Sequence, residues 1–244
     1  KILEKKGIQF EQCISSSNGL IIRNKIRAEE LPMYHEGGFI VQDEGAQFAS
    51  ELAATGNREK ILDVCAAPGG KTCALIDSIP QSAGLLALDI NQYRLELLRA
   101  NLKRLNFSCK VHQVDATDYN ILPGQNFDLI ILDAPCSSSG VIRRHPDIKI
   151  KKNLENLSAT LELQIRLLSN IWRFLAVGGE LLYITCSIFK KENDQMIFKF
   201  LGMQKNASLI RLDEEWGFET KVGRQILPGT NNSDGFYYSK LRKT

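Results

Sequence analysis

The fold is decided by the stretch KILDVCAAPGGKTCALIDS, residues 60–78. Residues 60–64 form a short apolar run that favours a strand, and residues 71–78 have the periodicity of a helix. The residues between them are small, so a ligand can approach the backbone where the helix begins. Free N–H groups at a helix N-terminus favour an anionic part of such a ligand. The stretch therefore predicts a strand, a loop and a helix that hold a nucleotide-like cofactor.

The same loop argues against two common nucleotide-binding motifs. A phosphate-binding loop follows the pattern G-x-x-x-x-G-K-[ST], but Cys65 stands where its first glycine is required. The dinucleotide fingerprint G-x-G-x-x-G is also absent from this loop. A nicotinamide-dependent oxidoreductase remains an alternative function, although the loop lacks the glycines of the dinucleotide fingerprint.

Outward from this stretch, short apolar runs alternate with longer segments of helical periodicity. This alternation predicts an α/β domain with a mostly parallel sheet and helices on both faces. The expected strands are 60–64, 85–89, 110–114, 129–132 and 180–185. The expected helices are 71–78, 91–105, 154–175 and 191–201, and Gly178-Gly179 is expected to end the third of these. Residues 206–212 and 235–241 are predicted as antiparallel edge strands joined by a polar loop.

The N-terminal part has a different character. Residues 1–37 contain one short apolar strand, 20–22, among charged residues, and too little apolar content for a core of their own. We interpret them as part of a small α/β subdomain. Residues 38–244 are predicted to be the catalytic domain, which opens with a helix through Leu52 capped by residues 42–44.

Composition limits the classes of function. The 244 residues, 43% of them hydrophobic, are sufficient to bury a substantial core, and the net charge of +3 means that any RNA-binding surface must be local. The six cysteines are scattered without a Cys-x-x-Cys pair, so we expect reduced thiols and no metal site. No apolar run is long enough to span a bilayer. We expect a cytoplasmic monomer that does not bind membranes.

Acidic residues follow two further expected strands. Asp89 ends the strand after the glycine loop, where a carboxylate can accept both hydroxyls of a ribose. Asp115 ends the third strand and is followed by Ala116. Together with the loop, these carboxylates suit S-adenosylmethionine, although either could merely cap the segment that follows it.

Two cysteines stand at the ends of apolar runs fifty residues apart: Cys136 in Asp133-Ala134-Pro135-Cys136 and Cys186 in Thr185-Cys186-Ser187. A thiolate can add to an otherwise unreactive pyrimidine ring, and a second thiol can assist loss of the proton that must leave afterwards. Buried packing is the alternative role for each cysteine. If both strand ends meet at one pocket, the pair predicts a base-modifying enzyme.

The sequence closely resembles the RsmB (Fmu, Sun) family of RNA cytosine-5 methyltransferases from about Gly38 to the C-terminus. The matching segments are 41–44, 63–71, Asp89 with Arg94, 115–116, 133–137, 143–149, 185–187 and 234–236. Residues 143–149 and 225–229 are most similar to the bacterial small-subunit rRNA enzymes of this family. The resemblance implies a Rossmann-like methyltransferase fold, S-adenosylmethionine as cofactor, and a small N-terminal subdomain of the RNA-binding type. The cofactor-binding set that it implies is Cys65, Ala66, Ala67, Pro68, Gly69, Gly70, Lys71, Asp89, Arg94, Asp115, Ala116 and Asp133.

The resemblance also implies the roles of the reacting groups. Cys186 is the nucleophile toward carbon 6 of cytosine, Asp133 meets ring nitrogen 3, and Cys136 assists release of the carbon 5 proton. Lys71 orients Asp133 or compensates its charge, or else serves only the helix start. DNA cytosine-5 methyltransferases instead attack with the cysteine of a Pro-Cys motif, so sequence physics leaves the roles of Cys136 and Cys186 open.

The resemblance implies that the substrate is structured RNA, in particular 16S rRNA. The target cytosine is expected to be exposed, because a stacked base hides its ring faces. Arg143, Arg144, His145 and Lys149 form a basic segment after Cys136 and are predicted to contact RNA phosphates. A solvated surface is the alternative for this segment. Two further alternatives are a tRNA cytosine-5 methyltransferase and an inactive RNA-binding scaffold of the same fold.

Overall fold

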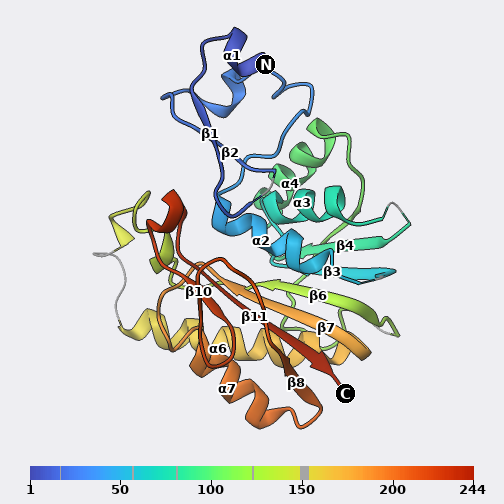
Figure 1. Ribbon diagram of the computed structural model, residues 1–244. Coiled ribbons are helices and arrows are strands. Elements are labelled where there is room, and N and C mark those ends of the chain that lie inside the picture. The colour runs from blue at the N-terminus through green and yellow to red at the C-terminus, as the bar shows by residue number, and fades with distance from the viewer. Residues whose placement is uncertain (17, 57, 81, 123, 149–153) are drawn as a thin grey trace.

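The computed structural model describes residues 1–16, 18–56, 58–80, 82–122, 124–148 and 154–244. Within these ranges nine strands form one sheet in the order β5-β4-β3-β6-β7-β11-β10-β9, with β8 paired to β11 (Figure 1). The strands from β3 to β7 run parallel to one another, and the C-terminal strands are antiparallel to their neighbours. The predicted α/β fold is confirmed.

The parallel part of the sheet comes from the apolar runs seen in the sequence. Its strands are β3 (Lys60–Val64), β4 (Gly84–Asp89), β5 (Lys110–Gln113), β6 (Phe127–Asp133) and β7 (Leu175–Thr185). Ile61 and Leu62 are neighbours on opposite faces of β3, and both are fully buried. A strand that is buried on both faces needs a nearly continuous apolar run, which is why the central strands lack alternation.

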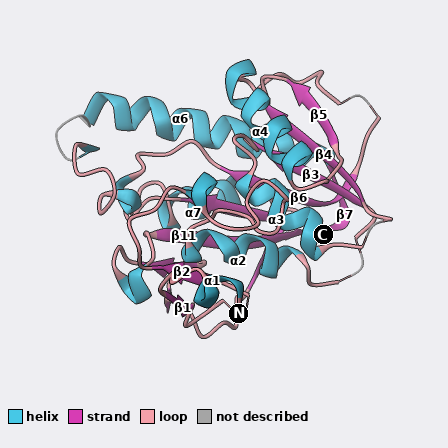
Figure 2. Cartoon of the chain, turned by 90° about the horizontal axis from the view of Figure 1, so that it is seen from above, coloured by secondary structure: helices cyan, strands magenta, loops and turns pink. Residues whose placement is uncertain are grey.

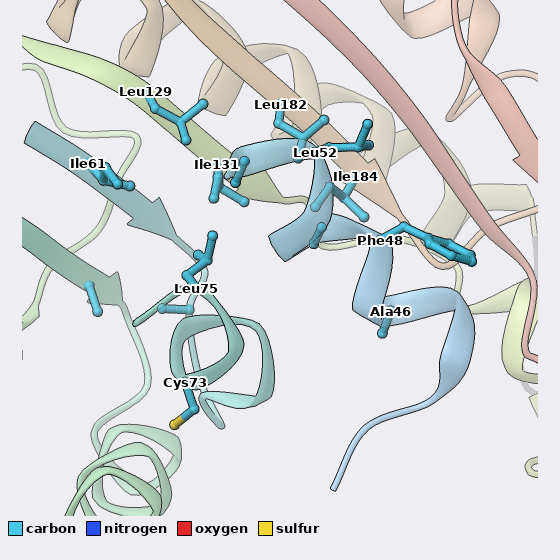
Figure 3. Packing of buried hydrophobic residues seen from close by; sticks show 14 of the residues in the cluster. Ala46, Phe48, Leu52, Ile61, Cys73, Leu75, Leu129, Ile131, Leu182 and Ile184 are labelled. Carbon is cyan, nitrogen blue, oxygen red and sulfur yellow. The ribbon is translucent and has the colours of Figure 1, made fainter. Parts of the chain in front are cut away.

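Helices cover both faces of this sheet (Figure 1). One face carries α2 (Glu44–Ala53), α3 (Gly70–Ser78) and α4 (Gln92–Arg104), and the other carries α6 (Leu154–Ile171) and α7 (Asp194–Met203). Figure 3 shows Phe48 and Leu52 of α2 beside Ile131 and Ile184 of the sheet. Asp43 caps α2 as predicted, because its side chain accepts a hydrogen bond from the Gly45 N–H.

The carboxyl ends of the parallel strands meet at one edge of the sheet. Val64 is in register with Leu88 of β4 and with Leu132 of β6, and Asp133 is in register with Ile184 of β7. The loops that follow these strands therefore emerge side by side. This edge is where ligands bind in open α/β sheets.

The predicted end of the long helix was wrong. We expected a helix over 154–175 that stops at Gly178-Gly179, but α6 ends at Ile171 and a 3₁₀ turn leads into β7 at Leu175. The two glycines instead lie inside β7, where Phe127 pairs with Leu175 but Leu129 pairs with Glu180. The extra residues form an irregularity in the strand, and Gly178 has a φ of +81°, which glycine adopts without strain. Helix α7 also begins three residues later than expected, at Asp194.

The C-terminal strands also differ in part from the prediction. β8 (Ala207–Ile210) pairs antiparallel with β11 (Phe236–Lys243), as expected. β11 is not an edge strand, however, because it also pairs with β7 and with β10 (Arg224–Ile226). β10 pairs in turn with β9 (Phe218–Glu219). These two strands are too short to give a pattern in the sequence.

The first residues form a separate small sheet. Helix α1 (Ile2–Lys5) precedes β1 (Phe10–Gln12) and β2 (Leu20–Ile22), which pair antiparallel. Figure 2 shows this hairpin at the margin of the molecule, on the side of α2. The hairpin contacts α2 through the Ser15 N–H, which donates to Glu44 at 2.7 Å. The division into domains at residue 37 stays a prediction.

Short 3₁₀ helices occupy Ala28–Glu30, Ser139–Val141, Trp172–Phe174 and Thr230–Asn232.

Replacing Gly69 by alanine should destabilise the fold at the loop before α3. Gly69 has a φ of +99°, and a Cβ there would lie 2.9 Å from Leu98 Cγ. Gly229 has a similar φ of +93° with nothing within 4 Å, so Gly229→Ala isolates the backbone cost. We expect Gly229→Ala to lower the free energy of unfolding by about 1 kcal/mol, and Gly69→Ala by a further ~1–3 kcal/mol from overpacking. Urea unfolding measures both, and equal losses would contradict this account.

Candidate active site

The glycine loop after β3 is held from two sides. The Ala67 N–H donates to Asp89 Oδ2 at 3.1 Å, and Arg94 donates to the Ala67 carbonyl. Beneath the loop, the Thr72 hydroxyl donates to Asp63 Oδ2 at 2.6 Å. The pKa of Asp63 is raised to about 7, chiefly by burial, although the Thr72 hydrogen bond opposes the rise. These contacts shape the loop while leaving Gly70 open, since a Cβ there would meet only the Val41 carbonyl oxygen, at 3.9 Å.

Two of the predicted cofactor carboxylates take part in local turns. Asp89 ends β4, is 3% exposed, and also accepts from the Asn91 N–H at 2.9 Å. Asp115 lies two residues beyond the end of β5 rather than at the strand end as predicted. Its carboxylate accepts from the N–H and hydroxyl of Thr117, which lowers the pKa of Asp115. The capping role that we considered for these residues is thus present in both.

The loops after β6 and β7 bring the two cysteines together. Cys136 Sγ and Cys186 Sγ lie 3.4 Å apart, although the residues are fifty positions apart in the chain. The loops are also joined through the backbone, because the Gly140 N–H donates to the Cys186 carbonyl at 2.9 Å. Glycine is required there, since a Cβ on residue 140 would lie 2.1 Å from the Gly235 carbonyl oxygen. Both cysteines are partly exposed, so neither is a fully buried packing residue.

A lysine and a carboxylate lie beside this pair. Lys71 Nζ donates to Asp133 Oδ2 at 2.8 Å, which links the start of α3 to the end of β6. Burial alone would lower the Lys71 pKa, but the Asp133 carboxylate outweighs it and raises that pKa. Lys71 therefore stays charged, and it is close enough to Cys186 to influence its ionisation.

The two thiols have opposite tendencies to ionise. The pKa of Cys186 is lowered, first by the hydrogen bond from Cys136 and also by the Ser138 hydroxyl and the charge of Lys71. The pKa of Cys136 is raised by its hydrogen bond to Cys186, by burial, and by the negative charges of Cys186 and Glu192. Ser138 reaches Cys186 from a backbone with a φ of +57°, an uncommon conformation for a residue other than glycine. The arrangement favours a thiolate on Cys186 and a thiol on Cys136.

A buried polar network missed by the sequence analysis lies behind the cysteines. Glu192 is fully buried and accepts hydrogen bonds from the N–H and hydroxyl of Ser137 and from the hydroxyl of Ser187. In the sequence Glu192 falls inside a charged segment of a predicted helix, which is typical of a solvent-exposed face. Its partner Ser137 is 55 positions away, so no local pattern marks the contact.

The predicted RNA-contacting arginines lie against two carboxylates, of which Asp234 is buried and Asp43 is partly buried. Arg144 Nε donates to Asp234 Oδ2 at 2.6 Å, and Arg143 lies 4.0 Å from Asp43 and 3.9 Å from Asp234. Both arginines remain exposed for roughly half of their side chains, at 43% and 53%. His145 is exposed beside them. Lys149 lies outside the described residues.

Two further observations concern the described residues alone. They contain no group of three or more histidine, cysteine or acidic side chains placed to hold a metal ion. No helix within the described ranges combines the length and the apolar character needed to cross a membrane.

The chain is similar to curated proteins along its whole length. It is 39% identical to the ribosomal RNA small subunit methyltransferase B of Pseudomonas syringae pv. tomato, over 100% of this chain and 56% of that protein. It is 45% identical to the protein of the same name from Shewanella oneidensis, over 87% of this chain and 50% of the relative. The chain thus spans about half the length of these relatives.

Solved structures share the fold. A methyltransferase homologue from Pyrococcus horikoshii superposes with a TM-score of 0.84 at 26% identity, covering 99% of this chain and 80% of that one. NSun6 from the same organism, solved with SFG, gives a TM-score of 0.79 at 28% identity, covering 93% and 60% of the two chains. The family described as 16S rRNA methyltransferase RsmB/F matches residues 51–242. Because that match covers most of the chain, and relatives at about 40% identity cover nearly all of it, this chain belongs to the 16S rRNA methyltransferase RsmB/F family.

Proposed function

We propose that this chain transfers a methyl group from S-adenosylmethionine to carbon 5 of a cytosine in structured RNA, and that the RNA is 16S rRNA. One observation carries the proposal: two thiols lie 3.4 Å apart beside a lysine–carboxylate pair at the edge of the glycine loop. Membership of the RsmB/F family and relatives named as small-subunit rRNA methyltransferases support it. We further propose that the chain acts in the cytoplasm as a monomer, without a metal ion.

The residues of the site fit S-adenosylmethionine. The carboxyl edge of the parallel strands combines the open glycine loop with Asp89, Asp115 and Asp133, all at or just after the ends of strands. A carboxylate at the end of β4 suits ribose hydroxyls, and the start of α3 favours the carboxylate of the methionine part. When bound, the cofactor would supply an electrophilic methyl group. NSun6 solved with SFG, an S-adenosylmethionine analogue, supports this choice of cofactor.

The residues of this chain account for the activation of cytosine. Carbon 5 of cytosine is a poor nucleophile, so a thiolate must first add to carbon 6 and place electron density on carbon 5. Cys186 performs this addition, because its neighbours favour the thiolate. Asp133 faces ring nitrogen 3 and must be transiently protonated to pass that nitrogen a proton as charge develops. Lys71, whose Nζ lies 2.8 Å from Asp133 Oδ2, orients the carboxyl group and can supply this proton.

Release of the product requires the second cysteine. After methylation, the proton on carbon 5 leaves, the electron pair reforms the double bond between carbons 5 and 6, and the Cys186 sulfur departs as a thiolate. Once its sulfur is bonded to carbon 6, Cys186 no longer carries the negative charge that raises the Cys136 pKa, so Cys136 can lose its proton to solvent. The Cys136 thiolate, next to the attacking sulfur, then accepts the proton from carbon 5. The Lys71 charge and the Ser138 hydroxyl favour the thiolate of Cys186, whereas the Glu192 charge opposes that of Cys136, and these neighbours favour this division over the alternative in which Cys136 attacks.

RNA binding is proposed for the surface around Arg143, Arg144 and His145, with Lys149 nearby in the sequence. The two arginines are oriented by Asp234 and Asp43, so they present directed guanidinium groups rather than a diffuse basic patch. The N-terminal hairpin is proposed to be part of an RNA-binding subdomain.

Bisulfite mapping of RNA methylated in vitro would identify the cytosine and distinguish 16S rRNA from tRNA. Absence of methylation would favour the inactive scaffold.

The two cysteine variants should fail at different steps. Cys186→Ala removes the attacking sulfur, so methyl transfer should fall to background and no RNA adduct should form. Cys136→Ala keeps the attacking sulfur and Lys71 but removes the hydrogen bond that lowers the Cys186 pKa, so addition should continue with a pH profile moved to higher pH. Release is impaired, so a covalent protein–RNA adduct should accumulate. Radiolabelled methyl transfer and denaturing gels measure the two outcomes. Adducts with Cys186→Ala and none with Cys136→Ala would reverse the roles.

Removing the charge of Lys71 should raise the pKa of Cys186. The lysine stabilises the thiolate, and without it the Asp133 carboxylate opposes ionisation. In Lys71→Met, the pH profile of Cys186 alkylation by iodoacetamide should therefore move to higher pH, as followed by peptide mass spectrometry. Lys110→Met, at an exposed residue of β5, is the control and should leave the profile in place. An unchanged profile in Lys71→Met would argue against this electrostatic role.

Asp89 should govern cofactor affinity. S-adenosylmethionine should raise the melting temperature of the wild-type protein, because a ligand that binds only the folded state stabilises it. Asp89→Asn should weaken this binding about tenfold or more, since hydrogen bonds to a charged group contribute ~1.5–3 kcal/mol. Asp77→Asn, at an exposed residue of α3, should keep wild-type affinity. Stabilisation by NAD and not by S-adenosylmethionine would favour the oxidoreductase alternative.

A further inference from the structure

The residues that follow the two cysteines share one buried carboxylate. Glu192 Oε1 accepts from the Ser137 N–H at 2.7 Å, and Glu192 Oε2 accepts from the Ser137 hydroxyl at 2.5 Å. The hydroxyl of Ser187 also donates to Oε2. Ser137 follows Cys136 and Ser187 follows Cys186. A single side chain therefore holds the two loops that carry the reacting sulfurs.

Further contacts make this connection rigid. The Ser139 hydroxyl lies 3.0 Å from that of Ser137 and 3.1 Å from that of Ser187, which closes a ring of three hydroxyls. Gln164 donates to Glu192 Oε1 at 3.3 Å and to the Pro135 carbonyl at 2.8 Å, on the other side of Cys136. Ser137, Ser139, Ser187, Gln164 and Glu192 are all at most 5% exposed.

The carboxylate of Glu192 is itself well fixed. The hydroxyl of the fully buried Tyr183, on β7, donates to the Glu192 carbonyl at 2.8 Å and ties its backbone to the sheet. The donors that the structure describes on the carboxylate are neutral: hydroxyls, an N–H and an amide. A buried charge held only by neutral donors is costly unless every donor stays in place. The network therefore resists separation of the two loops.

We propose that Glu192 is a positioning residue that clamps the two cysteine loops together and sets the distance between their thiols. Glu192 is bonded to neither sulfur and acts through Ser137 and Ser187. Its importance for methyl transfer rests on the function proposed above, but the clamp itself does not. Small displacements of reacting groups matter, since about 1 Å of misplacement can cost ~100-fold in rate.

The clamp can be tested without RNA by using phenylarsine oxide as a probe of thiol proximity. Its arsenic condenses with two thiols, forming two As–S bonds and releasing one water, so neither sulfur is oxidised. Capture of the second thiol is intramolecular, so affinity depends on how closely the two sulfurs are held. The Cys136→Ser variant, which retains only one thiol of the pair, gives the background from the other cysteines.

Three variants separate positioning from general stability. Glu192→Ala should lower the affinity for phenylarsine oxide about tenfold or more and lower the rate of RNA methylation by about 10–100-fold. Glu192→Gln keeps an acceptor for the Ser137 N–H and should recover part of both losses. Glu180→Gln is the matched control: Glu180 is a buried carboxylate nearer the other end of β7, bound by Arg58, Lys240 and Arg242. It should lower the melting temperature while keeping wild-type affinity for the arsenical.

The outcomes distinguish the clamp from the proposed function. If Glu192→Ala does not fold, the clamp is tested by the affinity for phenylarsine oxide of Glu192→Gln and of the double variant Ser137→Ala/Ser187→Ala. Wild-type affinity in the folded Glu192 and serine variants, or an equal loss in Glu180→Gln, would overturn the clamp. If the wild-type protein methylates no RNA but the Glu192 variants still lose affinity for phenylarsine oxide, the clamp is supported and the proposed function is refuted.

Discussion

The parallel pairing of β6 with β7 is the constraint on which the site depends. Asp133 stands opposite Ile184, so the chain leaves both strands at one edge and each cysteine follows within three residues. Ile131 pairs with Leu182, and both are fully buried on the sheet face that carries α2. A slip of one residue would exchange side chains between the two buried faces and disrupt the close packing of both. Core packing therefore brings the two strand ends together, which is a precondition for the 3.4 Å contact between the sulfurs.

The site separates two chemically identical side chains by their surroundings. Cys186 lies near the Lys71 ammonium and the Ser138 hydroxyl, whereas Cys136 is affected by Glu192 and by its hydrogen bond to Cys186. Pairs of titratable groups whose environments move their pKa values apart are typical of sites that divide two roles between them. In this chain the difference supports the proposed assignment of addition to Cys186 and of elimination to Cys136.

Three segments that match the family but contain none of the proposed reacting groups contact one another in the structure. Residues 41–44 were predicted only as a helix cap and residues 143–149 only as RNA contacts, and residues 234–236 had no predicted role beyond matching the family. In the structure, Asp43 accepts from the Asp234 N–H at 3.0 Å, and Asp234 binds Arg144 through two nitrogens. The Gly235 N–H donates to the Gly140 carbonyl at 2.9 Å, so this group of contacts continues into the Cys136 loop. The arginines expected to meet RNA are thus fixed relative to the reacting cysteines.

The sequence by itself determined the α/β fold, the glycine loop, the family and the residues Asp133, Cys136 and Cys186, because local periodicity and short motifs carry that information. It predicted β3 with the bounds that the structure has and placed the ends of β4 and β7 correctly. It misplaced Gly178-Gly179, because glycine favours a helix end and an irregular strand alike. Only the tertiary structure decided that Glu192 is buried and that the sulfurs meet. Both facts depend on hydrogen bonds and packing between segments that lie 48–55 residues apart in the chain. A local sequence pattern contains no information on the energy of such contacts.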